Sequence, residues 1–388
     1  MCYCRLNTAI LAFVMTVVLS SPCGATGAFH ELDPQQRHTD VSGKLEITVS
    51  EPFTISSRDE RPEMGRHEQP HLFMMPNGDI HLVFHRDRDI DAAERVILRS
   101  SDGGQSWEPM PIAVHRHEAV GVLSDGTVLV YDDYCFHKEG NVFVGEMCVS
   151  EDGGRTFGPV ELATFIRPDN FATRAMAEEH VANYRDTSAQ WSNLIGHALW
   201  RSVIELPDGT LIACAHTQYQ GDDRLRTIVY RSTDAGRTWG SEVTVAYDPE
   251  IRGQGFCEPV MALLANGDLL CVMRTGGNRP LMQSRSTDGG VTWEPPVATG
   301  SLGVDPDLHL MSNGVLACSH GRPGNRIMFS ADGTGEEWTD RLQIYEYERG
   351  SFGYTGIVEV EPETLLMVYD RRDTRSIEGV FITVRRTD

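Results

Sequence analysis

The chain has 388 residues, of which 40% are hydrophobic, so it can bury a sizeable core in one large domain or two ordinary ones. Its 56 acidic and 34 basic residues give a formal net charge of -22, which repels nucleic acids and anionic membranes. The cysteines and histidines lack the spacing that is typical of a zinc site. We therefore expect no nucleic-acid partner, no metal and no cofactor.

The N-terminal segment has the composition of an export signal. Arg5 supplies a positive charge, residues 9–19 form an apolar run, and small residues follow at Ala25, Gly27 and Ala28. The run is short for a membrane span, and we find no longer one elsewhere in the sequence. We expect a signal peptide over 1–28 and a linker over 29–45, in a secreted or periplasmic protein without a membrane span.

Six segments of the remaining chain share one pattern, an apolar run followed by a turn and a second apolar run. Examples are HLFMMPNGDIHLVF and RSVIELPDGTLIAC. Asn-Gly and Asp-Gly between alternating apolar runs are strong signals of β-hairpins. The six predicted turns lie near Gly78, Gly126, Gly209, Gly267, Gly314 and Glu363.

A second motif alternates with these hairpins. Its five copies are SSDGGQSW (100–107), SEDGGRTF (150–157), STDAGRTW (232–239), STDGGVTW (286–293) and the degenerate SADGTGEEW (330–338). The aspartate can accept backbone hydrogen bonds, glycines adopt the positive φ of a tight turn, and the aromatic ring fills the space beneath. We therefore predict that these boxes cap hairpins and take no part in catalysis.

One hairpin ending in a turn and a second ending in a box make a unit of four strands. Six such units predict an all-β fold, a six-bladed β-propeller of four-stranded antiparallel blades over 46–388. The segments KLEITV (44–49) and GVFITVRR (379–386) are left over at the two ends, and we expect them to pair and close the ring. One interval is longer than the others, which predicts an insertion at about 160–198.

Polar residues recur at the open ends of the six hairpins. Counting outward from Gly267 places Glu258 beside Thr275 and close to Arg274. The same count predicts five further neighbours: Glu68 with Asp87, Glu118 with Asp133, Arg201 with His216, Asp305 with Arg322, and Tyr354 with Arg371. Because a core does not tolerate unpaired charges, we predict a polar cup around the propeller axis, where some of these groups only close the ring as ion pairs.

The boxes resemble the Asp-box of the sialidase superfamily, and the chain resembles a sialidase-type propeller from about residue 46 to its end. Three longer segments are more specific than the boxes. GFCEPVMALLANGDLLCVMR (255–274) resembles the sialidase segment with a glutamate before an inner strand and an arginine after the next. SFGYTGIVEVEPETLLMVYD (351–370) resembles the segment of the nucleophilic tyrosine, and GRPGNRIMFSADG (321–333) that of the third substrate-binding arginine.

This resemblance implies an exo-α-sialidase-like glycosidase that removes terminal sugars from glycans by a retaining mechanism. Sialic acid carries a carboxylate on its anomeric carbon, which repels a carboxylate nucleophile, so tyrosine attacks instead. The resemblance assigns Tyr354 as nucleophile and Glu258 as its base. It assigns the general acid to Asp89, with Asp87 and Asp91 as rivals.

Arginine is expected at the substrate carboxylate because its planar fork matches the two oxygens. The resemblance assigns Arg274 to this role and also Arg322, with Arg326 as a rival. Sialidases have Arg-Ile-Pro at the entrance to the first blade, whereas this chain has Glu68-Gln69-Pro70. Glu68 would repel a sialic acid unless it is protonated or paired. The arginines that could compensate are Arg66, Arg86, Arg201 and Arg371.

Two other functions fit the same sequence. A propeller enzyme acting on another polysaccharide could use histidine as acid or base, with candidates His71, His117, His216, His309 and His320. A glycan-binding propeller without catalysis could stack sugars on Trp191 and Trp200. The distance between Tyr354 and Glu258 distinguishes these hypotheses, because two side chains within hydrogen-bond distance favour the sialidase-like enzyme.

Overall fold

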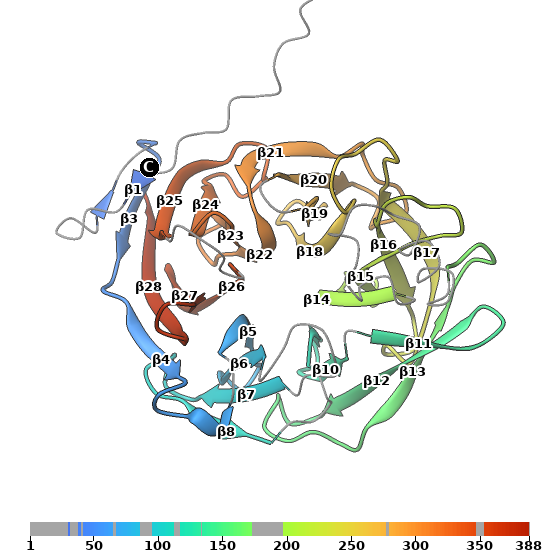
Figure 1. Cartoon of the computed structure of the whole chain (residues 1–388), viewed down its shortest axis with the longest axis horizontal. Helices are drawn as coiled ribbons and strands as arrows, with labels where there is room; N and C mark the ends of the chain where they lie inside the picture. The colour runs from blue at the N-terminus through green and yellow to red at the C-terminus, as the bar shows by residue number, and fades with distance from the viewer. Residues whose placement is uncertain are drawn as a thin grey trace, which may run out of the picture.

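The computed structural model describes residues 30–31, 38–39, 42–64, 67–85, 95–111, 117–132, 134–172, 197–276, 279–346 and 353–387. Within these ranges the secondary structure is β-strand except for one short 3-10 turn, η1 (Pro62–Met64). The prediction of an all-β protein is confirmed. The sheets follow one another around a ring in chain order (Figure 1). No helix in the described part is long and apolar enough to cross a membrane.

Two of the sheets have four antiparallel strands in sequence order. The first consists of β5 (Glu68–Met74), β6 (Ile80–His85), β7 (Arg95–Ser100) and β8 (Glu108–Met110). The other consists of β18 (Cys257–Leu263), β19 (Leu269–Arg274), β20 (Pro280–Ser286) and β21 (Val297–Leu302).

Two further sheets extend the same order with strands from the N-terminal part of the chain. One contains β1 (His30–Glu31), β22 (Val304–Leu310), β23 (Leu316–Gly321), β24 (Asn325–Ser330) and β25 (Thr339–Tyr345). The other contains β2 (His38–Thr39), β3 (Leu45–Val49), β4 (Phe53–Ser57), β26 (Thr355–Glu361), β27 (Thr364–Arg371) and β28 (Ser376–Arg386). In this sheet Val49 is paired with Ile382 and Leu45 with Arg386, so the two ends of the fold pair as predicted.

The remaining nine strands form one sheet that is linked through several short pairings. They are β9 (Ala119–Val122), β10 (Val128–Tyr131), β11 (Tyr134–Glu139), β12 (Val142–Ser150), β13 (Glu161–Ile166), β14 (His197–Glu205), β15 (Leu211–Thr217), β16 (Arg226–Ser232) and β17 (Thr238–Ala246). Parallel contacts join β9 to β14 and β13 to β17, and β11 pairs with β14. Strand β13 lies in the interval predicted as an insertion, and residues 173–196 of that interval lie outside the described ranges.

The boxes are turns held by their own side chains. The Asp288 carboxylate accepts hydrogen bonds from the backbone N–H groups of Val291 (3.1 Å) and Thr292 (2.9 Å), and from the Thr292 hydroxyl (2.6 Å). A box also contacts a hairpin turn of another sheet, since the backbone N–H of Asn77 donates to the carbonyl of Gly153 (3.4 Å). The boxes therefore lie at the turn end of the hairpins, away from the end that carries Glu68.

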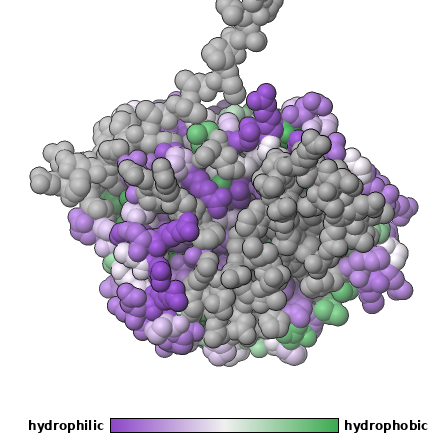
Figure 2. Space-filling view, viewed as in Figure 1, coloured by the Kyte–Doolittle hydropathy of each residue, from purple (hydrophilic) through white to green (hydrophobic). Residues whose placement is uncertain are grey.

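Apolar residues fill the space between neighbouring sheets. Leu72 and Phe84 from one sheet share a buried cluster with Leu366 and Val368 from the next. The side chains left exposed are mostly polar, and the described part of the face in Figure 2 is largely hydrophilic, with small scattered hydrophobic areas. This packing leaves the polar ends of the innermost strands, β5, β14, β18, β22 and β26 among them, facing the middle of the ring (Figure 1).

Candidate active site

Four of the innermost strands share an unusual backbone feature. The antiparallel register shifts, as at a β-bulge, near the start of β5, β18 and β22 and in the middle of β14. A residue other than glycine has a positive φ at each shift; these residues are Gln69 (55°), Arg201 (50°), Glu258 (45°) and Asp305 (46°). Such conformations cost of order 1 kcal/mol each and are concentrated at functional sites.

Glu258 is the centre of the candidate site. Its side chain is buried, and its Oε1 accepts hydrogen bonds from the Tyr354 hydroxyl (2.8 Å) and from Nη1 of Arg274. Its Oε2 accepts a hydrogen bond from the backbone N–H of Asp305 (3.0 Å). The register of β18 shifts between Cys257 and Val260, so that Cys257 lies opposite Arg274 in the ladder, and the Arg274 side chain pairs with Glu258. The predicted proximity of Glu258 and Arg274 is therefore found.

Tyr354 comes from a distant part of the chain, immediately before β26. It follows Gly353, whose φ of 68° is favourable for glycine, and its side chain is 5% exposed. The ring lies beneath Arg322, whose Cζ is 5.7 Å from the ring centroid. Tyr354 is thus within hydrogen-bond reach of Glu258, and Arg322 and Arg274 lie on either side of this pair.

The residues around Arg274 stabilise its positive charge. Burial opposes that charge, but Glu258, together with Tyr354 and Cys257, outweighs burial and raises the pKa of Arg274. The guanidinium therefore stays positive beside a carboxylate that also accepts the proton of a phenol. This arrangement can withdraw a proton from Tyr354 while a cation remains available for an anionic or hydroxyl group of a ligand.

Arg201, a predicted substrate-binding residue, lies in a separate buried network. Its guanidinium pairs with Asp305, contacts Asp307 (3.2 Å), and donates to the carbonyl of Thr355 (2.7 Å). On the other side of this network His71 contacts Glu118 (2.8 Å). The side chain of Arg201 is 3% exposed and fully engaged, so it ties three sheets together at the axis.

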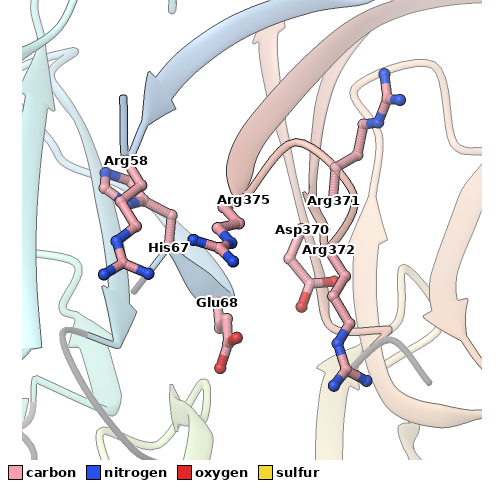
Figure 3. Close-up of a pocket in the computed structure, with 7 residues that line it drawn as sticks. All are labelled: Arg58, His67, Glu68, Asp370, Arg371, Arg372 and Arg375. Atoms are coloured by element: carbon pink, nitrogen blue, oxygen red, sulfur yellow. The ribbon is translucent and has the colours of Figure 1, made fainter. Parts of the chain in front are cut away.

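Glu68 and Arg371 line a cavity of about 240 Å³ together with Asp370. Arg371 is bound to Asp373 (2.6 Å) and lies over the ring of Tyr345 (4.7 Å to the centroid). Arg371 therefore lines the same cavity as Glu68, but its side chain points away from Glu68 (Figure 3) and pairs with Asp373.

The remaining predicted residues lie elsewhere. Arg326, the rival of Arg322, donates to Gln343 of β25 (2.8 Å). The predicted acid Asp89 and its rivals Asp87 and Asp91 lie outside the described residues, as do Arg66, Arg86 and Trp191. Within the described residues no cluster of histidine, cysteine and carboxylate side chains is placed to hold a metal ion.

The histidines near the open ends are mostly unsuited to proton transfer at neutral pH. Burial and then the charge of Arg274 lower the pKa of His216 to about 4. Burial, followed by Arg326, lowers the pKa of His320 to about 3, and burial also lowers the pKa of His117 and His309. The exception is His71, where burial and Arg201 lower the pKa but Glu118 and Asp305 outweigh them and raise it.

One residue of the site was missed in the sequence. Asp370 is buried, and its carboxylate accepts hydrogen bonds from the backbone N–H groups of Gln69 and Gly353. Burial, followed by the charge of Glu68, raises its pKa to about 7. Its signal is a carboxylate that ends the apolar run LLMVYD, the strand after the Tyr354 hairpin.

The described part of the chain is all-β, and its fold is similar to that of sialidases. Residues 182–366 match the family model of the BNR repeat-like domain, which confirms the resemblance inferred from the boxes. No curated protein sequence matches the chain.

Among solved structures, a protein of unknown function from Dyadobacter fermentans is similar with a TM-score of 0.67 and 19% identity, over 87% of this chain and 99% of that one. The Hadza microbial sialidase Hz136 has a TM-score of 0.60 and 17% identity, over 87% and 68%. The α-L-arabinanase of Penicillium chrysogenum, solved with arabinobiose, has a TM-score of 0.58 and 17% identity, over 86% and 98%. At these identities the likeness concerns the fold.

Proposed function

We propose that the protein is a secreted retaining glycoside hydrolase that removes terminal sugars, sialic acid or a related sugar, from glycans with Tyr354 as nucleophile. The observation that carries the proposal is the 2.8 Å hydrogen bond between the Tyr354 hydroxyl and Glu258. A phenol has a pKa of about 10 and needs a base to act at neutral pH. A tyrosine oriented toward a carboxylate in a polar site suits this role better than a tyrosine in an apolar core.

We further propose that the fold is a six-bladed propeller. The nine-stranded sheet divides at its short parallel contacts into two four-stranded units, β9 with β10, β12 and β13, and β14 with β15, β16 and β17. Together with the four other sheets this makes six units around the ring. Strand β11, which pairs with both units, then belongs to an elaboration of the second blade.

In the proposed first step the Tyr354 oxygen attacks the anomeric carbon and its proton passes to Glu258. The bond from the anomeric carbon to the leaving oxygen breaks, and a general acid protonates that oxygen; Asp89 is the proposed acid. In the second step this carboxylate takes a proton from water, which attacks the anomeric carbon. The bond to Tyr354 breaks, and the phenol recovers its proton from Glu258.

Arg274 and Arg322 have the proposed role of holding the sugar over Tyr354. Both guanidinium groups are adjacent to the reacting oxygen, through Glu258 for Arg274 and through the ring for Arg322. Arg201 and Arg371 are better suited to positioning, because Asp305 and Asp373 already occupy them.

The two alternatives have less support. A histidine mechanism needs a histidine that titrates near neutrality, and the pKa of His117, His216, His309 and His320 is lowered by burial. The pKa of His71 is raised, but its side chain is buried against Glu118. A binding propeller with Trp200 as a sugar platform needs an open indole. Trp200 is 8% exposed and donates its N–H to Asp305 (3.1 Å).

Assays on a panel of chromogenic glycosides, including sialosides and arabinosides, test the proposal. The wild type should release the chromophore from at least one of them, and Tyr354→Phe should lower turnover by roughly 10³-fold or more without loss of the fold. Tyr247→Phe is a matched control, since the ring of this partly exposed tyrosine contacts Arg226. Wild-type turnover in Tyr354→Phe contradicts the tyrosine mechanism.

A further inference from the structure

The cavity beside Glu68 has an unusual concentration of arginine. Its lining residues are Arg58, His67, Glu68, Asp370, Arg371, Arg372 and Arg375. They come from the end of β4, the start of β5 and the turn between β27 and β28 (Figure 3). Four cations therefore face two carboxylates in a protein whose net charge is strongly negative.

The four arginines are not equally engaged. Arg371 is bound to Asp373 and lies 3.5 Å from Glu378, and in Figure 3 it points away from Glu68. Arg58 and Arg375 are exposed, and neither forms an ion pair with a carboxylate of the described residues. A backbone hydrogen bond from the N–H of Arg58 to the carbonyl of Arg375 (3.1 Å) holds these two residues side by side.

The two carboxylates of the cavity repel a bound anion less strongly than two full negative charges would. Asp370 is buried beside Glu68, and burial followed by that charge raises its pKa to about 7. Near neutral pH Asp370 is thus protonated about half of the time, and the acid form can donate a hydrogen bond to an anion. The groups that face it are Glu68 and His67 at β5, Arg322 after β23, and the arginines of the cavity.

The cavity adjoins the candidate catalytic pair. Asp370 accepts a hydrogen bond from the N–H of Gly353, the residue before Tyr354, and it attracts Arg322, which lies over the Tyr354 ring. A sugar attached at Tyr354 would therefore have the cavity within reach of one of its substituents.

We propose that Arg58 and Arg375, assisted by Arg372, bind an anionic substituent of the substrate, a carboxylate or a sulfate ester, in the cavity above Glu68 and Asp370. This proposal rests on the proposed glycosidase function and specifies its substrate class. It assigns the recognition of the anion to the turn between β27 and β28 and to the end of β4, where the family resemblance assigned no residue.

The test measures binding by calorimetry in the Tyr354→Phe protein, so that turnover does not enter. The carboxylate arm compares N-acetylneuraminic acid and glucuronic acid with their methyl esters, and the sulfate arm compares galactose 6-sulfate with galactose. We expect one anionic probe to bind about 10-fold or more tightly than its neutral partner. That preference should fall by a similar factor in Arg375→Gln and in Arg58→Gln, and binding should tighten from about pH 8 to about pH 6.

Arg155→Gln is the matched control, because it removes one exposed arginine at a box turn on the opposite end of the hairpins. This variant should leave the affinities for the anionic probe and for its neutral partner unchanged. Equal binding of acids and neutral partners, no binding of any anionic probe, or full anion preference in both Arg375→Gln and Arg58→Gln would overturn the proposal. Failure of the glycosidase function is seen separately, as no release of the chromophore from any glycoside of the panel by the wild type.

Discussion

Replacing Glu258 with glutamine tests the energetics and the chemistry of the site together. The substitution keeps the volume of the side chain and one acceptor oxygen, but it removes the charge that partners Arg274. The two side chains are 2% and 10% exposed, so the cation is left in a largely buried place. Removing one partner of a buried pair costs about 3 to 5 kcal/mol, and the slight exposure of Arg274 favours the lower end of this range.

Glu258→Gln should therefore lower the free energy of unfolding by about 3 kcal/mol, measured by urea denaturation. It should also lower kcat by about 10²- to 10⁴-fold, because the glutamine cannot accept the proton of Tyr354. Glu294→Gln is the control; it alters an exposed glutamate, and its effect should be within about 0.5 kcal/mol.

A double-mutant cycle with Arg274→Gln isolates the pair. The double variant should be less destabilised than the sum of the two single variants by about 1 to 3 kcal/mol, because each single variant leaves one buried charge unpaired and the double variant leaves none. A coupling energy near zero, or a Glu258→Gln protein with full stability and turnover, would refute this account of the site.

Four further predictions concern other parts of the molecule. Asp288→Ala should lower the melting temperature and leave the specific activity of the folded protein nearly unchanged, since Asp288 only holds its own turn; a large loss of turnover at full stability would contradict this. Side-chain and backbone hydrogen bonds lower the pKa of Asp102, Asp152 and Asp288 to about 2, so their contribution to stability is complete above about pH 4 and is lost as the pH falls toward 2. The pKa of Asp370 is raised instead, so wild-type stability should fall as the pH rises from about 4 to about 7, and Asp370→Asn should flatten that part of the curve; an unchanged slope would argue against the assignment. Protein from the native host should lack roughly the first 25 to 28 residues by mass spectrometry, and an intact Met1 in the mature pool would contradict export.

Counting residues outward from the hairpin turns predicted which strands pair and which residues lie close together within one hairpin. The turns at Gly78 and Gly267 define the pairs of strands around them, because the side-chain period is fixed and short turns leave little freedom of register. Glu258 and Arg274 lie on two strands of one hairpin, so counting from the turn brought them together. The pairing of residues 44–49 with 379–386 followed from two apolar segments that had no other partner.

Counting from the hairpin turns could not predict contacts between residues of different sheets. Arg201 was predicted beside His216, but the bulge in β14 turns it toward Asp305 in another sheet. Bulges depend on tertiary packing and leave no composition signal in a single sequence. Asp370 was missed for a related reason, since its raised pKa comes from burial and then from Glu68, which is about three hundred residues away in the chain and adjacent only in the fold.

The central claim is that Tyr354 is the nucleophile. The most direct measurement is to trap the intermediate with a fluorinated glycoside of the best substrate found on the panel, and to map the labelled peptide by mass spectrometry. The account predicts a covalent sugar on Tyr354 and no label in Tyr354→Phe. A label on Glu68, Asp370 or another carboxylate, or a product of inverted anomeric configuration without any label, would contradict it.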